Sequence, residues 1–125
     1  MSKTYRPFGN SEEEYSLAAP TNDRVKKLMK SELRAGMGSV SEKVQTARAF
    51  GWDPVEVIPN YTDSDGGESD VEPIGLPQHM VDVVKICLDG PNLQDREGEV
   101  RMDVAGEAKA DFMNIVGAMS SGSSR

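Results

Sequence analysis

The sequence predicts a mostly α-helical protein: a small helical bundle of about four helices with a disordered N-terminal arm, an acidic central linker and a flexible C-terminal tail. Three observations favour this fold class. Apolar residues recur at three- and four-residue spacing in four segments, which is the period of an amphipathic helix. Glycine follows three of these segments directly, where helices commonly end. The chain has 125 residues, of which 37% are hydrophobic and 6% aromatic, so a single domain with a small core is expected.

The N-terminal residues 1–20 are expected to be a flexible arm. They are polar, include the acidic run "SEEE" and show no sustained period. Their apolar positions, among them Tyr5, Phe8 and Tyr15, are scattered. Two interpretations stay open, an arm that docks on a partner and plain terminal disorder.

Residues 21–60 are predicted to form a helical hairpin with a short extended segment. The first helix, 22–35, has an apolar face, and Gly36 stands where a glycine would end it. Its other face carries five basic side chains: Arg24, Lys26, Lys27, Lys30 and Arg34. This face is a candidate site for an acidic partner or for phosphates, and the alternative is a solvated helix surface.

The second helix, 39–50, opens with the capping box "SVSE", and the proline-broken stretch "PVEVIPNY" after it is expected to be extended. Helices 22–35 and 39–50 would also fit a small helix-turn-helix regulator that binds DNA. Its recognition face would present Lys43, Gln45, Thr46 and Arg48. The turn "AGMGS" has two glycines and no apolar anchor beyond Met37, which disfavours this alternative.

Residues 61–75 contain the stretch "TDSDGGESDVEP" and are predicted to be an acidic linker. A calcium-binding EF-hand loop needs oxygen ligands at positions 1, 3 and 5, glycine at 6 and glutamate at 12. Starting from Asp63, position 5 is Gly67 and position 12 is Ile74, so the ligand register fails. One histidine and one cysteine cannot build an ordinary zinc site either. No metal and no cofactor is therefore expected.

Residues 76–119 are predicted to be a pair of core helices, and residues 120–125 a flexible tail. The stretch "GLPQHMVDVVKICLDGP" is apolar around most of its circumference, which favours a buried helix, although its β-branched residues leave a strand over 80–88 open. The last helix, about 103–119, has an apolar stripe. We expect four of the apolar side chains in these helices to pack together: Val84, Leu88, Phe112 and Ile115.

No catalytic motif is present, so the chain is expected not to be an enzyme. It contains no glycine-rich phosphate loop, G-x-S-x-G or H-E-x-x-H motif. His79 and Cys87 are eight residues apart, about 12 Å along a helix, and cannot form a catalytic pair there. A single cysteine fits a reducing compartment.

The net charge of −7 is unevenly distributed along the chain. Residues 1–50 contain nine basic and six acidic side chains, whereas residues 51–125 contain five and fifteen. The acidic half argues against nucleic acid as a partner. No apolar run is long enough to span a bilayer, and the N-terminus has no signal-peptide core. The chain is therefore expected to be cytoplasmic, with no membrane partner.

Three methionines, Met80, Met113 and Met119, are further candidate partner-binding residues. Methionine fills gaps in cores, and it is also frequent on adaptable binding surfaces. The second interpretation favours a protein that acts by holding another chain.

In layout, "MVDVVKICLDGP", its polar connector and "DVAGEAKADFMNIVGAM" resemble the tail assembly chaperones of long-tailed bacteriophages. Those proteins are small and largely helical, and they coat the tape-measure protein during tail building. The resemblance covers about residues 77–119 and contains no diagnostic motif. It implies a non-enzymatic assembly factor of virion morphogenesis in the host cytoplasm, which self-associates and binds a helical chain.

Overall fold

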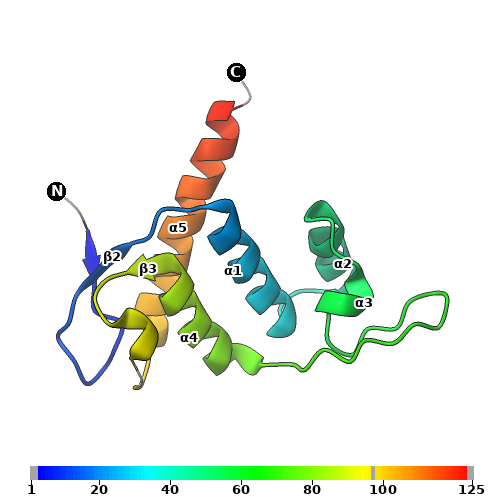
Figure 1. Cartoon of the computed structure of the whole chain (residues 1–125), viewed down its shortest axis with the longest axis horizontal. Helices are drawn as coiled ribbons and strands as arrows, with labels where there is room; N and C mark the ends of the chain where they lie inside the picture. Colours follow the sequence, from blue (N-terminus) through cyan, green and yellow to red (C-terminus); the bar gives the residue numbers. More distant parts are fainter. Residues whose placement is uncertain (1–2, 97, 124–125) are drawn as a thin grey trace. The chain divides into compact units, whose positions relative to one another are not determined.

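The computed structural model describes residues 3–96 and 98–123, and the elements it contains are shown in Figure 1. The α-helices are α1 (Asn22–Arg34), α2 (Val40–Ala49), α3 (Pro54–Val57), α4 (Gly75–Cys87) and α5 (Met102–Ser123). The strands are β1 (Thr4–Tyr5), β2 (Tyr15–Leu17) and β3 (Leu88–Asp89), and a short 3-10 helix spans Leu93–Asp95. The mostly α-helical class is confirmed, with five α-helices in the described chain and a small sheet that was not expected.

The chain divides into two compact units. The first contains the residues up to Val25 together with those from Met80 onward, and the second spans Lys26–His79. Because the first unit joins both ends of the chain, its packing depends on contacts between residues that are far apart in sequence.

The three-stranded sheet of the first unit corrects the prediction of a flexible arm. Its strands are antiparallel in the order β1-β2-β3, with Tyr5 opposite Tyr15 and Leu17 opposite Leu88. Tyr5, Phe8 and Tyr15 are buried. These residues looked scattered because part of their packing comes from the far end of the chain, where β3 pairs with β2 and Val100 forms a β-bridge with Phe8. The arm prediction is wrong for residues 3–20, and residues 1–2 lie outside the described residues.

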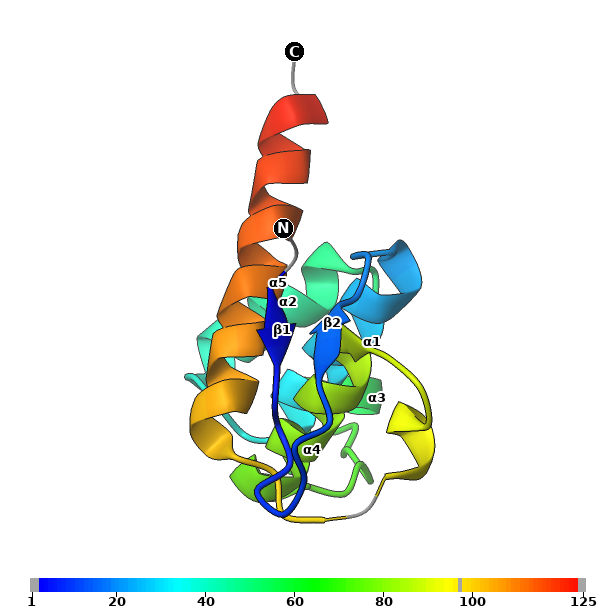
Figure 2. The ribbon, with the colours of Figure 1, turned by 90° about the vertical axis from the view of Figure 1, so that its left-hand side faces the viewer.

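The N-terminal segment is also attached to α5, which runs beside β1 and β2 in Figure 2. The Tyr5 hydroxyl donates a hydrogen bond to Asp111, and the Lys3 ammonium pairs with both Glu107 and Asp111. These bonds hold the pKa of the Asp111 carboxyl below its ordinary value of 3.8, with the Tyr5 phenol as the main cause and Lys3 as the second. A backbone hydrogen bond from the Arg101 N–H to the Pro7 carbonyl, at 2.7 Å, also connects the N-terminal segment to the start of α5.

Segment 80–88 is helical up to Cys87, so the strand alternative is wrong except at Leu88, the first residue of β3. Val84, Leu88 and Phe112 are fully buried, as expected. Ile115 is 40% exposed, so the prediction that it belongs to the same core is wrong. Helix α5 continues to Ser123, which makes residues 120–123 of the predicted tail helical, while 124–125 lie outside the described residues.

The second unit has its own small core under the helical hairpin. Leu33, Ala47, Val57 and Ile58 are buried together, and Val44, Trp52 and Tyr61 pack against them. The expected extended segment at residues 54–57 is instead one helical turn. Asp53 caps it by accepting a hydrogen bond from the Val55 N–H at 3.1 Å, and Pro54 provides a suitable first residue.

Within the predicted acidic linker 61–75, residues 61–69 form a hydrogen-bonded turn, and residues 70–74 connect it to α4 without helix or strand. The Asp63 carboxylate accepts the N–H groups of Asp65 and Gly67 at 2.9 and 2.7 Å, and Thr62 forms a β-bridge with Glu68. The Asp63 carboxylate therefore binds backbone N–H groups of its own turn.

Candidate interaction surfaces

The C-terminal half of α5 presents exposed apolar side chains. Five apolar residues follow one another at three- and four-residue spacing: Ala105, Ala108, Phe112, Ile115 and Met119. The first three are fully buried, whereas Ile115 is 40% and Met119 56% exposed. Figure 2 shows the end of α5 extending past β1 and β2 of its own unit. One continuous stripe is therefore covered by the chain as far as Phe112 and exposed beyond it. We call the exposed part, residues 113–119, the α5 surface.

The α5 surface lies in the longest uncharged run of the sequence. Residues 112–124 contain no charged side chain, and no other uncharged run exceeds the nine residues of 73–81. Charged groups are costly to remove from water, so a surface without them can be covered at little desolvation cost.

The three candidate methionines lie in different environments. Met80 is buried in its unit and is not accessible to a partner. Met113 is half-buried and Met119 exposed, and both belong to the α5 surface. The sequence could place all three on apolar faces, but it could not show where the neighbouring elements end.

The basic side chains of α1 are partly engaged by the chain itself. The Arg24 guanidinium donates to the Ile86 carbonyl at 2.7 Å, and Arg34 Nε donates to the Glu72 carbonyl at 3.1 Å. Lys30 Nζ lies 5.0 Å from the centre of the Trp52 ring, a cation–π distance. Lys26 and Lys27 are exposed. The two arginines thus bind backbone carbonyls that are distant in sequence, and the lysines are the more accessible part of this set.

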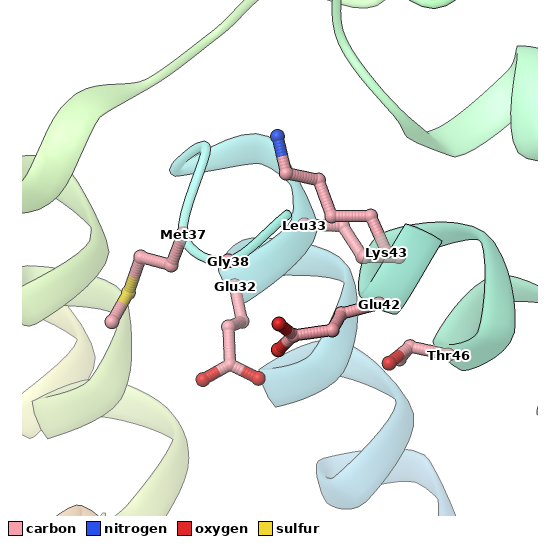
Figure 3. A pocket seen from close by; sticks show the side chains of 7 residues that line it. All are labelled: Glu32, Leu33, Met37, Gly38, Glu42, Lys43 and Thr46. Carbon is pink, nitrogen blue, oxygen red and sulfur yellow. The ribbon is translucent and has the colours of Figure 1, made fainter. Parts of the chain in front are cut away.

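A hollow of about 260 Å³ lies between α1 and α2 in the second unit (Figure 3). Glu32 and Leu33 come from α1, Met37 and Gly38 from the turn, and Glu42, Lys43 and Thr46 from α2. In Figure 3 the carboxylates of Glu32 and Glu42 approach one another, while the Lys43 ammonium points away from them. Gly36 and Gly38 have positive φ angles of 79° and 85°, which allow the tight turn between the helices.

A buried serine–histidine pair was not anticipated from the sequence. Ser31 Oγ on α1 lies 2.8 Å from His79 Nδ1 on α4, and both side chains are buried. The signal was Ser31 itself, a polar residue three positions after Leu28 on the apolar face of its helix. Buried polar groups in helices are usually paired, and this pair has the character of a structural hydrogen bond.

Neither a metal centre nor a membrane span is found in the described chain. Over residues 3–96 and 98–123, no three His, Cys, Asp or Glu side chains are grouped as metal ligands would be. In the same residues, every helix is too short or too polar to cross a bilayer.

Comparison with known protein families, curated proteins and solved structures finds no match to this chain. Any functional assignment must therefore come from its own surfaces.

Proposed function

We propose that this chain is a non-enzymatic interaction protein that binds a helical segment of another polypeptide along the α5 surface. The observation that carries the proposal is the apolar stripe of α5, which is buried as far as Phe112 and exposed at Ile115 and Met119. Exposed apolar residues on an ordered helix, with no charge among them, are typical of a surface that a partner covers.

The spacing of the exposed residues favours a helix as the partner. Ile115 and Met119 are four residues apart on one helix face, so their side chains can insert between those of a second helix. Met113 and Met119 add unbranched side chains that adapt to different apolar neighbours. Such a surface suits an assembly factor or chaperone that holds another chain. The resemblance to phage tail assembly chaperones suggests a role in virion morphogenesis.

The alternative, DNA binding by α1 and α2, has less support. Lys43 and Thr46, two of its would-be recognition residues, line the same hollow as the carboxylates of Glu32 and Glu42. Phosphates would meet these negative charges. In gel-shift experiments with DNA of mixed sequence, the protein should accordingly not slow the DNA at physiological salt.

A photo-crosslinking amino acid placed at position 119 tests the proposal in cells that produce the protein. We expect a crosslink to one discrete segment of another protein. The same segment, made as a synthetic peptide, should gain helical circular dichroism when it binds the purified chain. The double variant Ile115→Glu/Met119→Glu should bind this peptide at least tenfold more weakly, since two charges would have to be buried.

The matched control is Met102→Glu/Ala110→Glu, which adds the same charge at two exposed positions of the same helix outside the α5 surface. It should change peptide affinity by less than twofold. Equal losses in both variants would contradict the proposal, and so would the absence of any discrete crosslink. A crosslink to a second copy of the chain would show self-association in place of a foreign partner.

A further inference from the structure

The exposed end of α5 contains an oxidisable side chain, Met119. We propose that oxidation of Met119 to methionine sulfoxide switches off partner binding by the α5 surface, reversibly and without unfolding the chain. This inference rests on the proposed function and adds the regulation of the same surface. Its structural basis is the position of an accessible thioether at the end of an apolar stripe.

Exposure divides the methionines of the described residues into groups. Met29 and Met80 are each only 9% exposed. Three others are accessible to solvent: Met37 at 40%, Met102 at 45% and Met119 at 56%. A peroxide must reach the thioether sulfur to oxidise it, so susceptibility follows exposure. Met119 should therefore be among the first methionines to react, whereas the two buried ones should react when the fold opens.

The reaction replaces an apolar side chain by a polar one. Hydrogen peroxide transfers one oxygen atom to the sulfur: the S–O bond forms as the O–O bond breaks, and water leaves with both peroxide protons. The sulfur is oxidised by two electrons and the peroxide is reduced. A methionine sulfoxide reductase, which takes two electrons from thiols, restores the thioether, so the change is reversible.

Position 119 makes this change effective for binding. Met119 follows Ile115 by four residues on the same helix face, and residues 112–124 around it carry no charge. A partner that covers this face with apolar side chains would remove the sulfoxide oxygen from water without giving it a hydrogen-bond donor. Binding of the oxidised chain is weakened by this desolvation.

The fold should tolerate the same change. The fully buried side chains of α5 all precede its exposed end: Ala105, Ala108 and Phe112. In the free chain, a sulfoxide at Met119 stays largely in water and interrupts no buried contact. Oxidation of the buried Met80 would instead place a polar atom in the core.

The first test needs no partner. After limited treatment of the purified protein with hydrogen peroxide, mass spectrometry should find sulfoxide forming at Met119 and Met102 at least tenfold faster than at Met29 and Met80. The midpoint of thermal unfolding should differ by less than about 2 °C between treated and untreated protein.

The second test measures binding of the synthetic peptide that corresponds to the segment crosslinked from position 119. Catalase removes the peroxide before the peptide is added, so that only the protein is oxidised. The treated wild type should bind at least fivefold more weakly than the untreated protein, and a sulfoxide reductase should restore its affinity.

Leucine variants assign the effect to one side chain. Met119→Leu keeps the stripe apolar, so it should bind the peptide within about twofold of the wild type and should be insensitive to peroxide. The matched control Met102→Leu removes an exposed methionine of α5 outside the α5 surface and should remain as sensitive as the wild type.

Four results would overturn this inference alone: oxidation of Met119 as slow as that of Met80, a large fall in the unfolding midpoint, unchanged affinity of the oxidised wild type, and an equal loss in Met119→Leu. If the untreated chain did not bind the peptide, the proposed function would be contradicted, and this inference with it.

Discussion

At the residue scale, burial sets the chemistry of Cys87. Its side chain is fully buried, and this burial raises the pKa of the thiol to about 12. Only the thiolate is nucleophilic, so a thiol with this pKa is almost entirely inactive near neutral pH.

We therefore predict that Cys87 reacts with a thiol reagent such as DTNB only when the protein unfolds. At pH 8, labelling in buffer should be at least a hundredfold slower than in denaturant, and its rate should follow the opening of the fold. Because Cys87 is the only cysteine, the absorbance of the released thiolate reports on this residue alone. Rapid labelling in buffer would mean that the thiol is accessible in the native state.

Asp111 gives a second prediction at this scale, on pH dependence. Its folded-state pKa is lowered by the Tyr5 hydroxyl and by Lys3, so its charged form stabilises the fold. This contribution is complete above the ordinary pKa of 3.8 and is lost as the pH falls through the lower folded-state value. About a third of the side chain is exposed, so the contribution should not exceed about 1.5 kcal/mol.

Urea unfolding of the wild type and of Asp111→Asn at pH 7, 5 and 2 measures this effect. The free energies of unfolding should differ at pH 7 and 5, with the variant less stable, and the difference should be smaller at pH 2. Asp65→Asn, an exposed change in the other unit, is the control. A difference that persists undiminished at pH 2 would assign the effect to packing.

At the element scale, the sequence predicts helices well and misses the sheet. Predicted helix boundaries agree within a few residues for α1, α2 and α4, because spacing, caps and terminating glycines are local signals. The strands have two or three residues each, too few for a period of two to be recognised. Tyr15, for example, is buried in β2, which pairs with β1 near the start of the chain and with β3 more than seventy residues later. No local pattern contains that information.

Element α5 allows a prediction that separates its two halves. Phe112 is fully buried, so Phe112→Ala should lower the free energy of unfolding by about 3–5 kcal/mol. Ile115, one turn later, is 40% exposed, and Ile115→Ala should cost only about 1 kcal/mol. Chemical denaturation followed by circular dichroism measures both. Equal losses would indicate that Ile115 is buried in solution, for example by a second copy of the chain.

At the scale of the whole molecule, the candidate sites were only partly predictable. The α5 surface follows from a stripe visible in the sequence, but its exposed end depends on where the rest of the unit stops covering the helix. The hollow depends on two glutamates ten residues apart, which the α1–α2 turn brings to one space. Conversely, the basic face of the first helix looked uniform in sequence, yet Arg24 and Arg34 bind backbone carbonyls of the chain.

The last prediction concerns the charge distribution of the whole chain. Lys26, Lys27 and Lys30 are exposed cations on a chain whose residues 51–125 carry a balance of −10. Exposed ion pairs contribute about 0–1 kcal/mol each, so these lysines should not hold the fold together. Several charges acting together can still steer a partner or a second copy into place.

Reversing these three lysines to glutamate takes the formal net charge from −7 to −13. We expect helical content to stay intact, while association with the partner or with a second copy weakens at low salt and recovers in part at high salt. Sedimentation velocity at two salt concentrations measures the association, and replacement of the same lysines by glutamine separates loss of the cations from gain of anions. If the reversal abolished DNA retention and left association unchanged, the helix-turn-helix alternative would replace the interaction role. If neither responded, these lysines would be an ordinary solvated helix surface, because a steering role requires salt-dependent association.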